Sequence, residues 1–380
     1  MSRMGTIGFA LLLAVTGSAA LADRSLVFDL TFVISGSNLE WPGANTKNIY
    51  KTSGRYAPRN IIATRNQIYK DEAIVVFPRW KPGVPITLGL VKLTKKGSSG
   101  KPVVSPFPSW ALQEEGNCKA LQNVVDIVLD VQDIVWVLDV GTVNTLEKSL
   151  PYCSPKVVAI NVRTGKVLKS IDLRMWISPA SRLQYLAVDY AKDGGIFLYI
   201  SDASTRAIIV YDVAENRGFR VVLPKAVTQE SSHRDVLYLS LLRKNSGASV
   251  LYFTYLSSNR MYSIKVENLR SGAASSSITD VGPKHAKIVI LGTDDGSAIF
   301  FRKKGHSDIF MWNVETKFST ENFILVQKGN DNRLPTQVAP GYKRLMWVLE
   351  SNFHDYLQNT VGCPGPSVLL HPLLKSAEYL

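Results

Sequence analysis

The sequence predicts an all-β fold, a six-bladed β-propeller, from two observations. The first is the stretch 182–213, which holds three short runs rich in Val, Ile, Tyr and Phe, followed by GFRVVL at 218–223. Tight polar turns separate these runs, as in consecutive antiparallel strands. In the first run, Tyr185, Ala187 and Asp189 share one face, so no helical stripe forms. The stretch therefore predicts a four-stranded meander.

The second observation is that a first strand, a polar turn and an aromatic second strand recur along the chain. Six copies follow one another at intervals of roughly 50 to 60 residues. Besides 182–213, the copies are 60–80, 123–141, 235–256, 287–302 and 336–351. Six radial sheets bury one another's faces in a ring. A large β-sandwich or two smaller β domains would use similar strands, but copies that fill the chain favour one ring, with the first strand of each copy innermost.

The N-terminus predicts a secretory signal peptide. Residues 1–22 contain the apolar run IGFALLLAV and finish in Ala20-Leu21-Ala22, which fits the small-residue cleavage rule, so cleavage before Asp23 is expected. The apolar run is too short for a membrane-spanning helix. We therefore expect a secreted, extracellular protein in which residues 23–380 form a single propeller domain.

Two apolar segments near the ends of the chain suggest how the ring closes. LVFDLTFVI (26–34) and SVLLHPL (367–373) both read as strands, and they are expected to meet in the last blade. Between the first of them and the first copy, the tract 35–56 is rich in turn formers and is expected to lack regular structure.

Cysteine usage predicts one disulfide bond. Cys118 precedes the first strand of the second copy and Cys153 follows its second strand, so a bridge between them would join the loops of one blade. Cys363 is left over, and the sequence does not decide whether it is free or paired elsewhere. The His and Cys spacings predict no metal site, and no cofactor is expected.

The formal net charge of +13 favours acidic partners such as matrix or membrane surfaces. Nucleic acid is a poor alternative, because the basic residues are dispersed and the compartment is wrong. A basic balance also simply keeps a protein soluble.

Common enzyme motifs are missing: no G-x-S-x-G elbow, Walker A loop or G-x-G-x-x-G occurs. What remains is a set of polar residues where strands of the copies end, each of which is most often a turn cap. They are Asp139, Asp189, Asp202, Arg206, Asp294, Asp295, Glu350, Asn352 and His354. No residue is assigned a catalytic role from these patterns.

Tracts across nearly all of the chain resemble the yellow and major royal jelly protein family of insects. They include WPGANTKNIYKTSGRYAPRNIIATR, WVLDVGTVNTLE, YISDASTRAIIVYDV and MWVLESNFHDY. SGRYAPRNIIATR, PFPSWALQEEGNC and NTVGCPGPSVLLHPL most resemble the yellow-g branch. The resemblance implies secretion, a six-bladed propeller, and roles in cuticle or eggshell (chorion) pigmentation and hardening. It also implies dopachrome conversion in some members and biogenic amine binding in salivary relatives.

The resemblance also implies a ligand site at one mouth of the channel. The positions that match the amine site of salivary relatives are Thr336, Gln337 and Asn352, while His354 stands where an aromatic residue is expected. An aromatic amine needs a stacking ring, partners for its hydroxyl and an acid for its ammonium. Asp189 or Asp202 would serve the ammonium if their strand ends reach the same mouth.

Three functional hypotheses follow. The favoured one is a secreted eggshell or cuticle protein that takes part in melanin pigmentation or matrix hardening and binds catechol- or indoleamine-derived molecules in its channel. The second is a dopachrome isomerase or decarboxylase, with His354 and the strand-end Asp residues as the only visible acid/base candidates. The third is a purely structural matrix protein.

Overall fold

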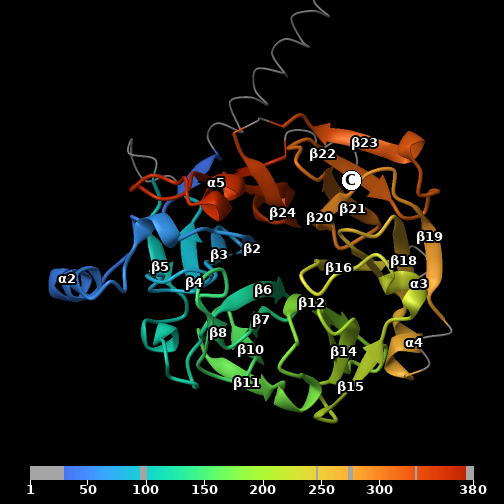
Figure 1. Cartoon of the computed structure of the whole chain (residues 1–380), viewed down its shortest axis with the longest axis horizontal. Coiled ribbons are helices and arrows are strands. Elements are labelled where there is room, and N and C mark those ends of the chain that lie inside the picture. The colour runs from blue at the N-terminus through green and yellow to red at the C-terminus, as the bar shows by residue number, and fades with distance from the viewer. Residues whose placement is uncertain (1–29, 95–100, 245–246, 273–276, 330–331, 374–380) are drawn as a thin grey trace, which may run out of the picture.

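The structure is a computed structural model that describes residues 30–94, 101–244, 247–272, 277–329 and 332–373. Six antiparallel sheets of four strands are arranged around a central axis (Figure 1). The fold is therefore the all-β, six-bladed propeller that the repeats predict. The proposed signal peptide, residues 1–22, lies outside the described residues.

The first three blades follow the chain without exchange of strands. Blade 1 consists of β2 (Arg65–Tyr69), β3 (Glu72–Val76), β4 (Leu88–Lys92) and β5 (Val104–Pro106). Blade 2 consists of β6 (Val124–Leu129), β7 (Ile134–Asp139), β10 (Lys156–Asn161) and β11 (Val167–Asp172), with the hairpin β8 (Thr142–Val143) and β9 (Leu150–Pro151) between β7 and β10. Blade 3 consists of β12 (Leu183–Tyr190), β13 (Ile196–Asp202), β14 (Ala207–Asp212) and β15 (Arg217–Val222).

The other three blades repeat this order except at the end of the chain. Blade 4 consists of β16 (Leu237–Arg243), β17 (Ser249–Tyr255), β18 (Arg260–Lys265) and β19 (Thr279–Pro283). Blade 5 consists of β20 (Ile288–Thr293), β21 (Ala298–Lys303), β22 (Ile309–Asn313) and β23 (Phe323–Gln327). Blade 6 consists of β24 (Leu334–Pro340), β25 (Met346–Ser351), β26 (Val368–Pro372) and β1 (Phe32–Ile34).

Blade 6 closes the ring with strands from both ends of the chain. β1 pairs antiparallel with β26, with Phe32 opposite Leu370 and Ile34 opposite Val368. This confirms the expected meeting of the segments 26–34 and 367–373, of which residues 26–29 lie outside the described part. Because the N-terminal strand completes the C-terminal sheet, the ring cannot open without breaking this ladder.

The hydrophobic core lies between the blades. The cluster at the closing interface combines Ile62 and Val75 of the first blade region with Trp347, Leu349 and Leu370 of blade 6, all of them buried. Two other tryptophans belong to core clusters between other blades, since Trp136 on β7 and Trp312 on β22 are also at most 2% exposed. Each blade is therefore stabilised mainly by its neighbours, as expected for radial sheets with two apolar faces.

The first strand of every blade lines the channel, as predicted. These inner strands are β2, β6, β12, β16, β20 and β24, and each contacts the inner strands of both neighbouring blades. All six run in the same direction along the channel axis, so their starts meet at one mouth and their ends at the other. We call the mouth where the inner strands start the N-terminal mouth.

Short helices lie in the loops between the strands. They are α2 (Ala44–Thr52), α3 (Lys225–Thr228), α4 (Val266–Arg270) and α5 (Phe353–Gln358), with 3₁₀ turns at Pro58–Asn60, Ala111–Gln113, Arg174–Trp176, Thr320–Asn322 and Tyr342–Arg344. No helix among the described residues is long and apolar enough to cross a lipid bilayer.

Helix α2 corrects one expectation. The tract 35–56 was expected to be irregular, but Ala44–Thr52 is helical. The turn formers Pro42 and Gly43 precede the helix, and its nine residues contain no Gly or Pro, so they are compatible with a helix despite the turn signals around them.

Candidate functional site: the N-terminal mouth of the channel

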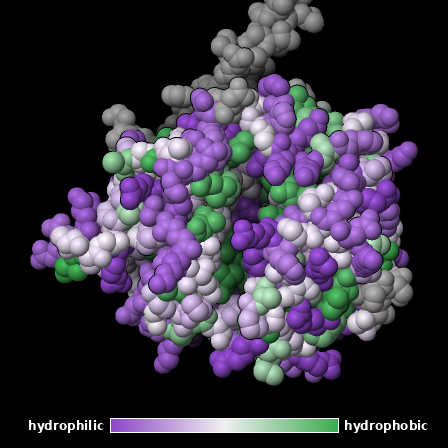
Figure 2. All heavy atoms as spheres, viewed as in Figure 1, coloured by the Kyte–Doolittle hydropathy of each residue, from purple (hydrophilic) through white to green (hydrophobic). Residues whose placement is uncertain are grey.

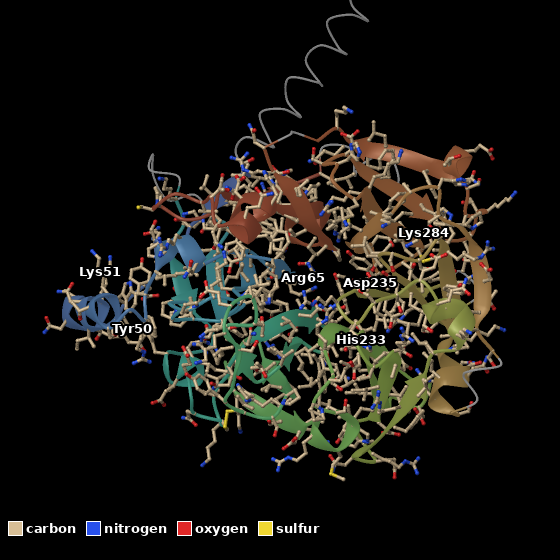
Figure 3. All side chains as sticks on the ribbon, in the orientation of Figure 1. Tyr50, Lys51, Arg65, His233, Asp235 and Lys284 are labelled. Carbon is tan, nitrogen blue, oxygen red and sulfur yellow. A yellow bond between two sulfur atoms is a disulfide. The ribbon has the colours of Figure 1, made fainter. Side chains whose placement is uncertain are left out.

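The central channel contains a cavity of about 160 Å³ that all six inner strands line. Its polar lining residues include Arg65, Asp126, Tyr185, Ser240 and Gln337, which come from five different blades. Figure 2 shows a hollow at the centre of the molecule with apolar residues on its wall. Figure 3 places Arg65 beside this channel, on the inner side of the ring.

A larger cavity of about 720 Å³ lies between α3 and blade 4. Its charged groups are mostly engaged with one another: Arg260 pairs with Asp280, and Glu230 accepts hydrogen bonds from Asn259. Lys284 donates to the carbonyl of Tyr255 at 2.7 Å, and burial lowers the pKa of Lys284 to about 8. Because titratable groups from several blades converge in the channel, the channel is the better candidate site.

Arg65 and Asp126 form the charged centre of the N-terminal mouth. Arg65 Nε lies 3.5 Å from Asp126 Oδ1, and both side chains are at most 15% exposed. Arg65 Nη2 donates to the hydroxyl of Tyr185 at 2.7 Å, while Nη1 donates to the carbonyls of Thr64 and Thr336 at 2.9 and 2.8 Å. One guanidinium thus connects β2 with β6, β12 and β24.

Irregular strand pairing explains why these groups meet. The ladder of β24 shifts register between Pro335 and Gln337, which frees the Thr336 carbonyl for Arg65. The ladder of β12 shifts between Leu183 and Leu186, and the Leu186 N–H donates to Asp126 Oδ2 at 2.8 Å instead. Bulges re-aim groups in this way next to many functional sites.

Two tyrosines and a second arginine extend this polar network; of the three, Tyr185 lines the cavity. Tyr185 and Tyr238 have ring centroids 5.2 Å apart, and the Arg65 guanidinium lies 5.0 Å from the Tyr185 ring centroid. Arg302 reaches from blade 5 and donates to the Pro335 carbonyl at 2.8 Å. Burial raises the pKa of Tyr185 and of Tyr238, so both phenols keep their protons and remain hydrogen-bond donors at neutral pH.

Asp126 is protonated more easily than an ordinary carboxyl. Burial raises its pKa to about 6, and this effect outweighs the opposing influence of Arg65 and of the backbone N–H groups of Leu186 and Ile127. Burial alone would lower the pKa of Arg65, but Tyr185 and Asp126 raise it overall, so the guanidinium stays charged. A carboxyl that titrates near neutral pH suits general acid or base catalysis.

Beside Arg65, polar side chains without partners face the joint between blades 1 and 6. Asn66 is fully buried, and neither Oδ1 nor Nδ2 has a hydrogen-bond partner among the described atoms, nor does Ser351 Oγ. Asn66 lies on the same face of β2 as Ile68, and Ser351 lies on the same face of β25 as Leu349. The two apolar residues, Ile68 and Leu349, belong to one core cluster. Asn66 and Ser351 therefore face the same interblade space, beside Gln337, whose Oε1 accepts from the Asn66 N–H.

The sequence-predicted residues Thr336 and Gln337 do lie at this mouth. Gln337 lines the cavity, and the Thr336 hydroxyl donates to the Leu349 carbonyl at 3.2 Å. Asn352 lies beyond the end of β25, where its amide donates to Asp355 and accepts from the Ser367 N–H at 2.8 Å. Both ends of this amide are thus used to tie the last blade together.

His354 sits on α5, next to aromatic residues. Its side chain is 40% exposed, and Nε2 lies 3.3 Å from Asp355 Oδ1. Phe353 packs edge-on against Trp80, with ring centroids 5.8 Å apart. Aromatic rings are therefore present beside His354, one on α5 itself and one on the loop that follows β3.

The structure does not bring Asp189 and Asp202 together. Asp202 pairs with Leu183 at the start of β12, whereas Asp189 pairs with Phe197 near its end, so the two lie toward opposite mouths. Asp189 forms an ion pair with Arg270, and Asp202 accepts hydrogen bonds from Thr205 and from the Arg182 N–H. Both carboxylates are fully buried and engaged in structural contacts.

Sequence reasoning missed Arg65, Asn66, Asp126 and Tyr185. The polar residues that it singled out lie mostly where strands end, whereas the four missed residues lie near the starts of the inner strands. The available signal was a charged residue within the apolar first strand of a copy, as in ATRNQIY and NVVDIVL.

A disulfide joins Cys118 and Cys153, the pair that the sequence predicts. It connects the loop before β6 with the segment that follows β9. Cys363 is exposed and carries a free thiol. Among the described residues, no group of three or more His, Cys, Asp or Glu side chains is arranged to hold a metal ion.

Comparison with known proteins gives a consistent family signal. The family model described as "Major royal jelly protein" matches residues 122–364. "Dopaminechrome tautomerase" of Drosophila melanogaster is 28% identical over 174 residues, which cover 44% of this chain and 37% of that protein. "Major royal jelly protein 1" of Apis mellifera is 28% identical over 177 residues, which cover 44% of this chain and 40% of that protein. "Protein yellow" of Drosophila melanogaster is 26% identical over 186 residues, which cover 47% of this chain and 34% of that protein.

The matched segment thus spans two fifths or less of the length of these relatives. Among solved structures, a streptogramin B lyase aligns with a TM-score of 0.42 at 13% identity, covering 82% of this chain and 79% of the other. A WD40 domain of Toxoplasma gondii coronin aligns with a TM-score of 0.45 at 10% identity, covering 83% and 70%. Similarities at this level say nothing about a ligand or a reaction.

Proposed function

The chain belongs to the major royal jelly protein family, and on that premise we propose that it is a secreted propeller that binds a catechol- or indole-derived small molecule at the N-terminal mouth of its channel. The role that fits this activity is pigmentation and hardening of eggshell or cuticle, which the resemblance to the family implies. Support for secretion comes from residues 1–22, whose pattern predicts a signal peptide.

The observation that carries the proposal is the unpaired Asn66 amide. A buried amide without partners destabilises a protein by about 1 to 3 kcal/mol, so such a group is retained where something else pairs with it. On the opposite face of β2, Arg65 offers donors together with the Tyr185 hydroxyl, and Tyr185 is an aromatic residue that lines the cavity. A flat molecule with hydroxyl or carbonyl groups matches this combination.

The binding experiment is a calorimetric titration with dopamine, serotonin and dopaminechrome. We expect dissociation constants below millimolar for at least one ligand, and a loss of at least tenfold in affinity on Arg65→Lys, which keeps the charge but removes the fork of donors. Arg163→Lys is the matched control, because Arg163 is 63% exposed and pairs with Asp133 at the surface. Absence of binding, or equal effects of both variants, would contradict the proposal and favour a purely structural matrix protein.

A second candidate function is tautomerisation of a dopachrome-type substrate. Asp126 favours it, because a carboxyl with a pKa of about 6 beside the channel can accept a proton from carbon and return it to another atom. The similarity to a protein named dopaminechrome tautomerase supports the same reading. Purified protein should then bleach dopaminechrome faster than buffer, and Asp126→Asn should remove this acceleration while Asp133→Asn does not. Equal rates with and without protein would leave binding as the function.

A further inference from the structure

Helix α2 stands apart from the ring. In Figure 1 it projects from the side of blade 1, away from the channel. None of its nine residues is buried. A helix this short is not stable in water on its own, so contacts at its base must hold it in place.

An aromatic cluster forms that base. Trp41 stacks on Trp110 with ring centroids 5.1 Å apart, and Tyr50 of α2 meets Trp41 edge-on at 5.3 Å. Tyr56 contacts Trp41 at 5.0 Å, and the Arg55 guanidinium lies 4.3 Å from the Tyr50 ring centroid. The helix is thus fixed at one side, while none of its residues is buried by the part of the chain that the structure describes.

The charge of this region has one sign. Between Glu40 and Asp71 the sequence contains six Lys or Arg residues and no Asp or Glu. Four of the six belong to α2 and the segment after it: Lys47, Lys51, Arg55 and Arg59. Lys51, Arg55 and Arg59 are exposed and Lys47 is partly exposed. We call α2 together with residues 53–59 the basic arm.

Acidic groups of neighbouring segments are engaged elsewhere. Glu115 lies 4.0 Å from the buried Arg79, and Glu40 accepts a hydrogen bond from Ser105. Figure 3 shows Tyr50 and Lys51 at the outer side of the molecule, far from Arg65 and the channel. The basic arm is therefore a separate surface from the ligand site.

We propose that the basic arm binds an acidic polysaccharide of the extracellular matrix, one that carries sulfate or carboxylate groups along its length. A protruding, rigid element with cations spaced along it suits a linear polyanion, because each contact releases counterions from the polymer. The cations combine with Tyr50, which edge-on contacts with Trp41 and Trp110 already hold in place, so little side-chain conformational freedom is lost on binding. This function is independent of the channel and goes beyond the proposed ligand binding.

The test uses dextran sulfate as the polyanion and two triple variants that each remove three charges. The arm variant is Lys47→Gln, Lys51→Gln and Arg59→Gln, which spares the stacked Arg55. The control variant is Lys166→Gln, Lys192→Gln and Lys317→Gln, three exposed lysines of blades 2, 3 and 5. The melting temperatures of both variants confirm that the fold is intact.

The arm variant is expected to lose at least tenfold in affinity at moderate salt, and the slope of log affinity against log salt should fall by about 2 to 3. The control should lose less than about threefold. Equal losses in both variants would show that net charge alone drives binding and would overturn the proposal. The proposal would also be overturned if the arm variant lost binding to anionic lipid vesicles but bound dextran sulfate as tightly as the wild type. A membrane surface would then be the partner.

Discussion

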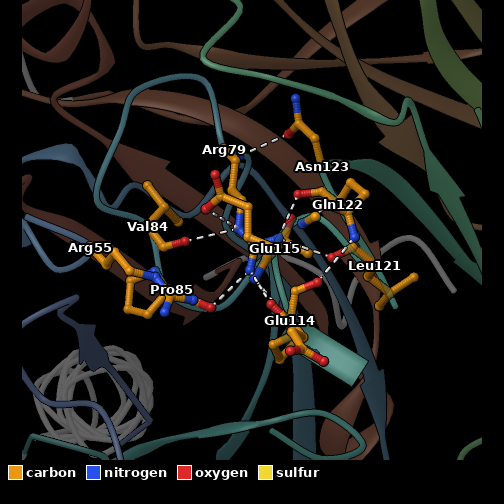
Figure 4. A network of polar contacts seen from close by, with 12 residues as sticks. Arg55, Arg79, Val84, Pro85, Glu114, Glu115, Leu121, Gln122 and Asn123 are labelled. Carbon is orange, nitrogen blue, oxygen red and sulfur yellow. Dashed lines mark hydrogen bonds and ion pairs between the residues drawn. The ribbon is translucent and has the colours of Figure 1, made fainter. Parts of the chain in front are cut away.

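Two arginines of the first blade region, Arg79 and Arg65, illustrate how the same residue type serves different purposes. Arg79 is 2% exposed, and its five guanidinium N–H donors bind five backbone carbonyls (Figure 4). The acceptors are the carbonyls of Val84, Pro85, Gln113, Leu121 and Gln122. Arg65 instead binds two carbonyls, a phenol and a carboxylate, and it lines a cavity.

The difference lies in the partners. Backbone carbonyls do not titrate or move independently of the fold, and the Glu115 carboxylate is 4.0 Å from Arg79 Nε, so Arg79 mainly fixes the loops between β3 and β6. Tyr185 and Asp126 are side chains whose protons and orientations respond to what enters the channel. An arginine whose donors all bind backbone carbonyls therefore stabilises the scaffold. An arginine that has titratable partners at a cavity is instead a candidate functional residue.

The largest effect should come from Arg79. Arg79→Met leaves five carbonyls without their donor, and we expect the free energy of unfolding to fall by about 3 to 5 kcal/mol, as when one member of a buried charge network is removed. Arg65→Met should have a smaller effect, because water can enter the channel and replace the donor. Denaturant unfolding of both variants measures the difference. A larger loss for Arg65→Met would reverse the comparison.

The next effect concerns pH and Asp126. Its pKa is raised in the folded protein to about 6, against about 3.9 in the unfolded chain. Its stabilising contribution is therefore complete below pH 4 and is lost as the pH rises through 6, by up to about 3 kcal/mol. The unfolding free energy of the wild type minus that of Asp126→Asn should decrease accordingly between pH 4 and 7. Asp133→Asn serves as a control, and a flat difference for Asp126→Asn would mean that this carboxyl is ionised throughout.

Arg65→Lys should separate stability from binding. The ammonium keeps the positive charge beside Asp126, so the unfolding free energy should change by less than about 1.5 kcal/mol, while ligand affinity falls at least tenfold, or about 1.4 kcal/mol. Unfolding curves and titrations on the same preparation measure both quantities. A variant that binds as tightly as the wild type would place the ligand away from Arg65.

The smallest effect belongs to His354. His354→Phe removes the surface contact between His354 Nε2 and Asp355 Oδ1, which contributes less than about 1 kcal/mol, and adds a ring next to Phe353. Dopamine affinity should rise, but by less than tenfold, because the side chain at this position is 40% exposed. An unchanged affinity in calorimetry would exclude His354 from the site.

The sequence was sufficient for the ring and its closure, because strand period, turn spacing and the apolar terminal segments are local patterns. β1 and β26 were expected to meet, and they do. Cys118 and Cys153 were expected to pair from their positions around one blade, and the structure joins them. Helix α2 was missed because its stability depends on Trp41 and Trp110, which tertiary structure brings to Tyr50.

The site was only partly predictable. Resemblance placed Thr336 and Gln337 at a mouth of the channel, and Gln337 lines the cavity. Arg65, Asp126 and Tyr185 come from three blades, and they meet because the ladders of β6, β12 and β24 shift register. A one-residue shift in pairing leaves no local mark on the sequence, so strand patterns alone could not show which side chains converge.

The most direct test of the account is the Asn66→Leu variant, measured for both unfolding and ligand affinity. The substitution replaces an unpaired buried amide with an apolar group of similar size. The unfolding free energy without ligand is expected to stay the same or increase, while affinity for the catechol or indole ligand falls at least tenfold. A loss of about 1 to 3 kcal/mol in stability with unchanged affinity would contradict it, because the amide would then belong to the scaffold through bound water.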